Sequence, residues 1–534
     1  MTDRARSHWA WGWSDKLPND DARLALAEQV GAMLGVDVPA LRPLPSLDDA
    51  QIPEPRVALP ADLAPFARAD RDDRARHTYG RSYRDIVRAF QGDFAVAPDF
   101  VAHPRTEDDV AKVIAWCSAE RVTLVPFGGG TSVVGGVEPI AGNGHRGVVS
   151  LDLRALDRVL EIDRTSRAAR IQAGATGPVF EAQLAAHGYS LRHYPQSFEF
   201  ATLGGMIATR AGGHFATLYT HIDDLVESVR MLTPRGPFET RRLPASGAGP
   251  SPDRLVLGSE GILGVITEAW MRVQSRPRWR SSASVFFHDL VTASRGARAI
   301  AQAALFPSNC RVLDPREALI NGVPTDGGAV LLLGFESADR SMEVAMDRAI
   351  ALAIENGGRC PRGAKHREEG ARGADPTGEA WRQAFFDGPY LQSALVSLGV
   401  IADTFETACT WDRFEHLYAA VVDAVTAAMK RVCGAGGISC RFTHVYPDGP
   451  APYFTFVAPG RAGAELEQWA TIKEAASDAL LANGATITHH HAVGRTHRPW
   501  YDRERPALFA DVLRAAKRAV DPESILNPGV LVDP

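Results

Sequence analysis

The chain has 534 residues, of which 45% are hydrophobic and 23% charged, and a formal net charge of −6. A chain of this length is too long for one ordinary core, so about two to four globular domains are expected. The mild charge does not indicate a nucleic-acid partner. Because there is no run of about 18 apolar residues, any membrane contact is expected to be peripheral.

Signals for secretion and for a disulfide scaffold are absent from the sequence. The N-terminus lacks a charged region followed by an apolar stretch. The six cysteines contain no C-x-x-C pair, which also argues against iron–sulfur ligation. A cytoplasmic protein is therefore expected.

Residues 1–95 predict a helical and extended segment that precedes the main body. Apolar periodicity predicts a helix over 22–34, and the prolines of 39–65 predict an extended stretch that wraps another domain. Three tryptophans alternate near the start, namely Trp9, Trp11 and Trp13. Packing of these tryptophans against the body is the favoured interpretation, and an interfacial membrane anchor is the alternative.

Strands and helices alternate over residues 96–276. Thr106, which is followed by acidic residues, is typical of a helix N-cap, and a proline stands at the start of the second helix. The expected helices cover 106–121 and 178–187, and the expected strands cover 122–125, 148–153, 169–174, 225–232 and 265–273.

The first of these strands runs into Gly128, Gly129, Gly130, Thr131 and Ser132. Consecutive glycines let backbone N–H groups face one side and let a ligand approach closely, which suits a diphosphate. The loop lacks the lysine of a Walker loop, and no helix follows it as in a dinucleotide fingerprint. A purely structural glycine turn is the alternative.

Two further glycine-rich segments follow, at 195–213 and 258–268. With the first loop, they resemble the FAD-binding domain of the vanillyl-alcohol oxidase / p-cresol methylhydroxylase superfamily. The resemblance implies that the first loop holds the diphosphate of FAD and that the other two line the flavin and adenine. The FAD-binding residues that it implies are Pro126, Gly128, Gly129, Gly130, Thr131, Ser132, Val133, Pro195, Ser197, Ala201, Thr202, Gly204, Gly205, Thr209, Ala211, Glu260, Gly261, Gly264, Val265 and Ile266.

Residues 277–485 predict a cap domain in which long helices cover an antiparallel sheet, so the fold class is α+β. The expected strands are 283–287, 329–335 and 453–457, and the expected helices are 292–305, 341–356, 411–432 and 465–481. Residues 360–378 predict a surface loop. In the last segment, 486–534, a helix over 506–519 precedes an ending that, by the same resemblance, returns to the FAD domain.

Three adjacent histidines, His489, His490 and His491, open this last segment. On a strand they would point to alternate faces and could not share one metal, so no metal site is expected. Imidazoles that move protons beside a flavin are the favoured interpretation, and hydrogen-bonded structural histidines are the alternative.

The triple histidine, with the segments 439–446, 405–407 and 411–413, resembles the alkyldihydroxyacetonephosphate synthase family. The resemblance implies flavin N5 adduct chemistry without net redox change, in which a fatty alcohol replaces the acyl group of acyl-dihydroxyacetone phosphate. It also implies a lipid-like substrate and a homodimer. The catalytic residues that it implies are Tyr453, His489, His490, His491, Arg311 and His193. Tyr453 would serve as a base only if its neighbours lowered the pKa of its phenol.

One residue departs from this family. Gln392 stands where the family usually carries an arginine, and an amide cannot replace a guanidinium that forks onto phosphate. This favours an alternative function, that of an FAD-dependent dehydrogenase or oxidase of a hydroxy acid or alcohol. No histidine lies in the first glycine loop, so FAD is expected to bind non-covalently, with attachment through the later histidines as the alternative.

Overall fold

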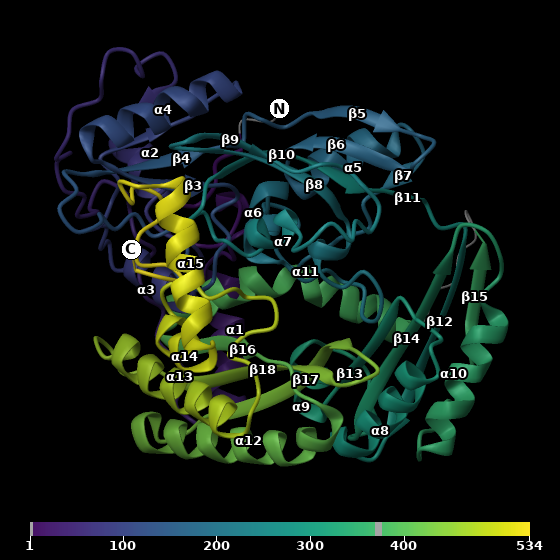
Figure 1. Ribbon diagram of the computed structural model, residues 1–534. Coiled ribbons are helices and arrows are strands. Elements are labelled where there is room, and N and C mark those ends of the chain that lie inside the picture. The colour runs from purple at the N-terminus through teal and green to yellow at the C-terminus, as the bar shows by residue number, and fades with distance from the viewer. Residues whose placement is uncertain (1–3, 369–375, 534) are drawn as a thin grey trace.

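The computed structural model describes residues 4–368 and 376–533. It contains sheets of four, five, two and seven strands. In Figure 1 the four- and five-stranded sheets occupy the upper half of the molecule, and the seven-stranded sheet occupies the lower half. Within the described ranges, no helix is both long enough and apolar enough to cross a membrane.

The N-terminal segment packs on the body of the protein. Trp9 and Trp11 are buried, and Trp11 and Trp13 both contact the ring of Phe200. These contacts confirm that the tryptophan cluster packs against the body. The elements of this segment are η1 Ser14–Lys16, α1 Asp20–Leu34, β1 Ala67–Arg68, α2 Arg71–Arg76 and α3 Tyr83–Phe90.

The four-stranded sheet carries the first glycine loop. Its order is β1-β2-β4-β3, and β3 runs parallel to β4 with the glycine loop between them in the chain. The predicted order of strand, loop and strand is therefore confirmed. Thr106 caps the following helix by accepting from the Asp109 backbone N–H, as predicted. The elements are β2 Phe100–Ala102, α4 Glu107–Glu120, β3 Thr123–Phe127 and β4 Val148–Asp152.

The five-stranded antiparallel sheet has the order β5-β6-β10-β8-β9. The second glycine segment, 195–213, contains α6, and the third, 258–268, runs into β10. The elements of this region are β5 Val159–Asp163, β6 Ala168–Gln172, α5 Gly177–Ala185, β7 Tyr189–Ser190, α6 Leu203–Thr209, η2 Ile222–Asp224, β8 Val226–Thr233, β9 Gly236–Glu239, α7 Pro252–Val256, β10 Val265–Arg272 and β11 Gln274–Ser275.

The cap contains a seven-stranded antiparallel sheet of order β15-β12-β14-β13-β17-β18-β16. Its strands are β12 Trp279–Phe287, β13 Asn309–Leu313, β14 Ala329–Ser337, β15 Lys365–Glu368, β16 Val400–Glu406, β17 Gly437–Val445 and β18 Pro450–Pro459. Its helices are α8 Leu290–Gln302, α9 Pro315–Ile320, α10 Glu343–Glu355, α11 Pro376–Ser397, α12 Trp411–Cys433 and α13 Glu465–Ala482.

Four of these helices, α8, α10, α12 and α13, lie along the outer side of the cap sheet, whereas α11 lies between that sheet and the upper sheets (Figure 1). The buried residues of α12 include Phe414, Leu417, Val421 and Val425, whose spacing of three and four residues makes one apolar face. The expected long helices over an antiparallel sheet are therefore confirmed, and the inner face of the sheet is left for a ligand.

The predicted surface loop over 360–378 is wrong in part. Residues 365–368 form β15, which pairs with β12 at the edge of the sheet, and α11 begins at Pro376. Residues 369–375 of that prediction lie outside the described residues. The local charge and glycine content favoured a loop at these residues. Both elements are stabilised by tertiary contacts, namely pairing with β12 and burial against the sheet, which local composition does not reveal. The kink-prone Pro389 inside α11 hid the helix further.

The chain ends beside the first sheet. The last helices are α14 Arg498–Glu504 and α15 Ala507–Val520. After α15, the N–H of Leu124 on β3 donates to the carbonyl of Ile525, and the N–H of Asn527 donates to the carbonyl of Leu124. The predicted return to the FAD domain is confirmed, and it brings the C-terminal segment, with its histidines, next to the glycine loop.

A network of two histidines and two aspartates joins α2 to the first sheet. His103 contacts Asp73 through Nε2 at 2.7 Å and Asp152 through Nδ1 at 3.3 Å, and His77 Nε2 lies 3.1 Å from Asp152. Burial alone would lower the pKa of His103, but the two carboxylates outweigh burial and raise it to about 9.

We expect the stability contributed by His103 to depend on pH with a defined sign. The folded-state pKa of about 9 lies above the ordinary value of 6.5, so this stability is fully present below 6.5 and is lost as the pH rises through 9. The free energy of unfolding of His103→Gln, measured with urea, should therefore fall further below that of the wild type at pH 6 than at pH 10. His288→Gln, at a highly exposed position, is the control and should show no such difference. An equal gap at both pH values would contradict the prediction.

Candidate active site

The glycine loop after β3 packs against the second glycine segment at backbone distance. A Cβ on Gly129 would lie 2.0 Å from the carbonyl oxygen of Phe200, and a Cβ on Gly128 would lie 2.2 Å from Oγ1 of Thr202. Gly130 has φ of +63°, in the left-handed region. Only glycine allows these approaches, so the two segments form one surface.

Backbone N–H groups of this loop have no acceptor in the protein. Among the described residues, those of Gly129, Gly130, Thr131 and Ser132 donate no hydrogen bond. These residues line a cavity between the glycine segments and the inner face of the cap sheet, which we term the central cavity. Unpartnered N–H groups around a pocket suit an anionic diphosphate, so the loop fits the cofactor that the sequence predicts.

The central cavity brings together nearly all of the predicted FAD-binding residues. It is lined by Pro126, Gly128, Gly129, Gly130, Thr131, Ser132, Val133, Pro195, Ser197, Ala201, Thr202, Gly204, Gly205, Thr209, Ala211, Glu260, Gly261, Gly264 and Ile266. Val265 is the exception. It is buried at the start of β10 in the core beneath the first sheet, because alternation along the strand turns it away from Gly264 and Ile266.

The N-terminal segment contributes to this surface, which sequence reasoning missed. Arg6 donates through Nη1 to the carbonyl of Gly129 at 2.9 Å, and the Arg81 N–H donates to the carbonyl of Ser132 at 2.6 Å. Trp11 lines the central cavity. These contacts hold the carbonyls of the glycine loop away from the cavity. No local pattern around Arg6 marks the contact, since its partner lies more than a hundred residues away.

The three histidines lie on a bend, not on the strand that the sequence predicted. The carboxylate of Glu406, at the end of β16, accepts the backbone N–H groups of His489, His490 and His491 and the hydroxyl of Thr488. An acceptor-only carboxylate with four donors is satisfied only when ionised. Because its side chain gathers consecutive N–H groups, the backbone curls around Glu406 and the imidazoles converge.

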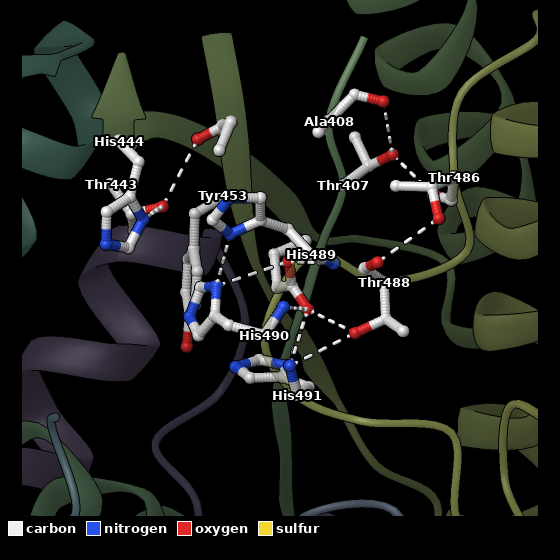
Figure 2. A network of polar contacts seen from close by, with 12 residues as sticks. Thr407, Ala408, Thr443, His444, Tyr453, Thr486, Thr488, His489, His490 and His491 are labelled. Atoms are coloured by element: carbon white, nitrogen blue, oxygen red, sulfur yellow. Dashed lines mark hydrogen bonds and ion pairs between the residues drawn. The ribbon is translucent and has the colours of Figure 1, made fainter. Parts of the chain in front are cut away.

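The converging imidazoles are neutral. Burial lowers the pKa of His444, His489, His490 and His491, and neighbouring imidazoles lower it further. Figure 2 shows His444, Tyr453 and the triple histidine side by side. Neutral rings can act both as donors and as acceptors, as proton transfer requires.

One group of three histidines approaches the geometry of a metal site. Among the described residues, nitrogen atoms of His444, His489 and His490 lie within 4.8 Å of one another. However, His444 uses both ring nitrogens, toward Thr443 and Gly213, and so does His489, toward Tyr446 and His490. These contacts explain the cluster as a hydrogen-bonded network without a metal.

Tyr453 does not meet the condition set for a base. Its hydroxyl donates to Oγ1 of Thr404 at 2.9 Å, and its ring contacts those of His490 and His491 without a hydrogen bond to either. Burial raises the pKa of Tyr453, although the Arg441 guanidinium lies 3.9 Å over its ring and opposes the shift. The neighbouring imidazoles do not lower the pKa of the phenol, because imidazoles that are themselves neutral do not stabilise a phenolate. Tyr453 is a protonated phenol in the cavity wall.

Arg311 is a buried cation without a counter-ion. It lies on β13, lines the central cavity and is 1% exposed. Its contacts are 3.4 Å long, to Nδ1 and the carbonyl of His214 and to the carbonyl of Thr443, and its Nε has no partner among the described residues. Burial lowers its pKa to about 9, with the nearby Arg441 adding to the shift. An anionic ligand group would complete this site.

The other predicted catalytic residues divide into two groups. Tyr453, His490, His491 and Arg311 line the central cavity, whereas His489 and His193 do not. His193 is fully buried against Gly213, and neither ring nitrogen has a partner among the described residues. Burial lowers its pKa to about 3. Its place behind the cavity wall gives it no direct access to a ligand.

Sequence reasoning also missed Arg441 and Glu317, which form a buried ion pair beside Tyr453. Arg441 lies within the segment 439–446 that carried the family resemblance, so its position held a signal. Glu406 lies within another such segment, 405–407. Arg441 of β17 contacts Glu317 of α9, and Glu406 of β16 contacts the irregular segment 488–491, so these contacts join distant parts of the chain and could not be derived from spacing.

Comparison with known proteins agrees with this geometry. The FAD binding domain family model matches residues 98–240, and the model of the C-terminal domain of FAD linked oxidases matches residues 276–531. Alkyldihydroxyacetonephosphate synthase from Dictyostelium discoideum is 29% identical over 489 residues, which cover 87% of this chain and 78% of the relative. A solved alkyldihydroxyacetonephosphate synthase structure matches with a TM-score of 0.80 and 25% identity, covering 98% of this chain and 97% of that one. The chain is an FAD-dependent enzyme similar to alkyldihydroxyacetonephosphate synthase.

The structure of p-cresol methylhydroxylase with substrate bound shares the fold at a TM-score of 0.65 and 16% identity, over 97% of this chain and 98% of that one. In this FAD-dependent enzyme, Glu260, one of the predicted FAD-binding residues that line the central cavity, also contacts the triple-histidine segment. Its carboxylate accepts the backbone N–H groups of Val493 and Gly494, and burial raises its pKa to about 7.

We expect Gly129→Ala to abolish retention of FAD. The added Cβ would meet the Phe200 carbonyl oxygen at 2.0 Å, and neither backbone can move without reshaping the N–H surface of the flavoenzyme. Gly247→Ala, at a position with open space around it, is the matched control. The flavin absorbance per protein after purification is the measurement, with circular dichroism to confirm folding. A folded, yellow Gly129→Ala protein would contradict the cofactor assignment.

We expect Glu406→Gln to destabilise the flavoenzyme by at least about 3 kcal/mol, since the amide NH₂ would face donors that need an acceptor. Glu504→Gln is the matched control, because Glu504 accepts from Thr486 and Ile487 of the same segment but is exposed. Urea unfolding of both variants checks the difference. Equal losses of stability would show that the buried carboxylate has no special role.

Proposed function

We propose that this enzyme replaces the acyl group of an acyl-dihydroxyacetone-phosphate-like ester with a long-chain alcohol. The observation that carries the proposal is the buried charge of Arg311 in the central cavity, which forms no ion pair with a carboxylate among the described residues and whose Nε has no hydrogen-bond partner there. The relatives are named for an alkyl dihydroxyacetone phosphate product, which has an anionic head and an apolar tail.

The walls of the central cavity support a substrate of this kind. Apolar side chains of α11 and β18 line it beside Arg311, including Phe385, Leu391, Leu395 and Val457. Transfer of an alkyl chain into such a wall is favourable in proportion to its area, by about 25 cal/mol per Å². A phosphate at Arg311 and a chain along α11 would place the linking carbons beside Tyr453 and the histidines.

The exchange requires the protein to bind the anionic head, to donate a hydrogen bond to a substrate oxygen and to accept a proton. FAD, when bound, supplies the ring that activates the substrate carbon. Arg311 holds the anionic head by charge-assisted hydrogen bonds, and Tyr453, kept protonated, donates a hydrogen bond to a substrate oxygen. The acyl group leaves as a carboxylate, and the incoming alcohol loses its proton, so each exchange releases one proton. A neutral histidine at the cavity, His490, is placed to accept it.

A dehydrogenase or oxidase remains the second candidate, and Gln392 is the observation that favours it. Its Nε2 donates to the carbonyl of Ala402 at 3.1 Å, so it lines the cavity but brings no charge. The relatives support this candidate less than they support the exchange. Anaerobic mixing with a panel of hydroxy acids and alcohols distinguishes the two. Loss of the oxidised flavin band at a catalytic rate would favour the redox function.

We further propose a cytoplasmic homodimer with a non-covalent flavin. None of the six cysteines, all of which lie in the described ranges, forms a disulfide, which supports a reducing compartment. Light scattering of the purified protein tests the dimer. Acid precipitation followed by fluorescence of the pellet tests the flavin linkage.

We expect Arg311→Met to lower kcat/KM for exchange of labelled hexadecanol into acyl-dihydroxyacetone phosphate by at least about 30-fold. Removal of a buried charged partner costs about 2 kcal/mol or more in complexes of this kind, which corresponds to that factor. The matched control is Arg295→Met, in an exposed ion pair with Glu415 on the outer helices. Incorporation of label checks both variants. The proposed function fails if the wild type incorporates no label, and the role of Arg311 fails if Arg311→Met matches the control.

A further inference from the structure

A chain of hydrogen bonds leads from the central cavity through the cap. His490 Nδ1 lies 3.0 Å from His489 Nδ1, and His489 Nε2 lies 2.8 Å from the hydroxyl of Tyr446. That hydroxyl lies 2.9 Å from Oγ1 of Thr220. His490 lines the cavity, whereas Tyr446 is half-buried and is followed by the exposed Pro447 and Asp448. The chain therefore connects the cavity with the side of the cap that faces water.

Both imidazoles use their ring nitrogens in the way that proton transfer requires. A proton can enter a neutral imidazole at one nitrogen while another leaves from the other nitrogen, so the ring passes on a proton without holding a charge for long. His489 has a hydrogen-bond partner at each nitrogen. His490 has a partner at Nδ1, and its Nε2 has none among the described residues.

The carboxylate of Glu406 sets the direction of this chain. Its Oε2 lies 3.4 Å from His490 Nδ1, which favours a proton on that nitrogen and leaves Nε2 as the acceptor. His490 Nδ1–H then donates to His489 Nδ1, and His489 Nε2–H donates to the Tyr446 hydroxyl. Burial keeps His489 and Tyr446 neutral, because it lowers the pKa of the first and raises that of the second.

We propose that His490, His489 and Tyr446 form a proton relay that carries the proton released in the cavity to the outer side of the cap. His490 Nε2 takes the proton of the incoming alcohol as the new carbon–oxygen bond forms. The Nδ1 proton of His490 moves to His489, the Nε2 proton of His489 moves to Tyr446, and Tyr446, which is half-buried beside the exposed Pro447 and Asp448, releases its hydroxyl proton to water. One proton enters and one leaves, and no electron changes place.

The relay rests on the proposed function for the source of its proton, but its geometry does not depend on the substrate. It explains why His489, which does not line the cavity, lies between a cavity residue and Tyr446 with both nitrogens bonded. It also gives a role to His221, whose Nε2 donates to the carbonyl of His489 at 2.9 Å and holds that residue in place.

Tyr446→Phe tests the relay, because it removes one hydroxyl and keeps the ring. We expect the exchange rate to fall by at least about a hundred-fold, the lower end of the range for loss of a proton-transfer group. We also expect the dependence of the rate on the deuterium content of the solvent to change from curved in the wild type, where several protons move together, to linear. Tyr418→Phe is the matched control, since Tyr418 packs on Phe414 and Phe454 of the same domain outside the relay. Wild-type rate and curvature in Tyr446→Phe would overturn the proposal.

A measurement without turnover separates this proposal from the proposed function. In the holoenzyme labelled with ¹⁵N-histidine, nitrogen shifts should identify His489 as neutral, with its proton on Nε2, and His490 as neutral, with its proton on Nδ1. Tyr446→Phe should shift the Nε2 signal of His489, and Tyr418→Phe should not. A cationic His489, or a His489 signal that ignores Tyr446→Phe, overturns the relay even if the exchange is confirmed. The expected shifts in an enzyme that incorporates no labelled alcohol would leave the relay standing and refute only the exchange.

Discussion

The active site depends on how two buried carboxylates hold one irregular stretch of backbone. Residues 486–494 follow α13 without helix or strand, so their N–H groups need acceptors from elsewhere. Glu406 of the cap takes those of the three histidines, and Glu260 of the cofactor surface takes those of Val493 and Gly494. The stretch is thereby fixed between the two domains, and His490 and His491 line the cavity that both domains form.

This arrangement places the buried arginines and the histidines that could transfer protons on different walls of one cavity. Arg311 and Arg441 are buried cations on neighbouring strands, and only Arg441 has a carboxylate partner, Glu317. Burial lowers the pKa of the histidines beside them and outweighs the opposing Glu406 carboxylate at His490, so the neutral form is favoured. An anion is thus attracted to one wall, and proton donors and acceptors are kept on another.

The N-terminal segment completes the cofactor surface from outside. Its arginines bind the carbonyls of the glycine loop, which leaves the N–H groups of that loop as the part that faces the cavity. The polarity of the loop is thus fixed in part by Arg6, which lies more than a hundred residues before Gly129 in the chain. A histidine and aspartate network around Asp152 ties the same segment to the end of β4.

Periodicity and capping along the chain predicted most helices and strands of both domains, because amphipathic faces and N-caps are local features. They failed for β15 and α11, which are stabilised by pairing and burial against β12 and the cap sheet. A helix with Gly388 and Pro389 inside it carries no clear local pattern.

The sequence by itself determined the cofactor surface, because three glycine segments can be recognised from residue identity alone, and nearly all of their predicted residues meet in one cavity. Only the tertiary structure decided the chemistry of the cap. The curl of the triple histidine, the raised pKa of Tyr453 and the missing partner of Arg311 arise from contacts between distant strands and from burial. Protonation state and charge balance depend on what surrounds a group in space, and the linear order of residues does not contain that information.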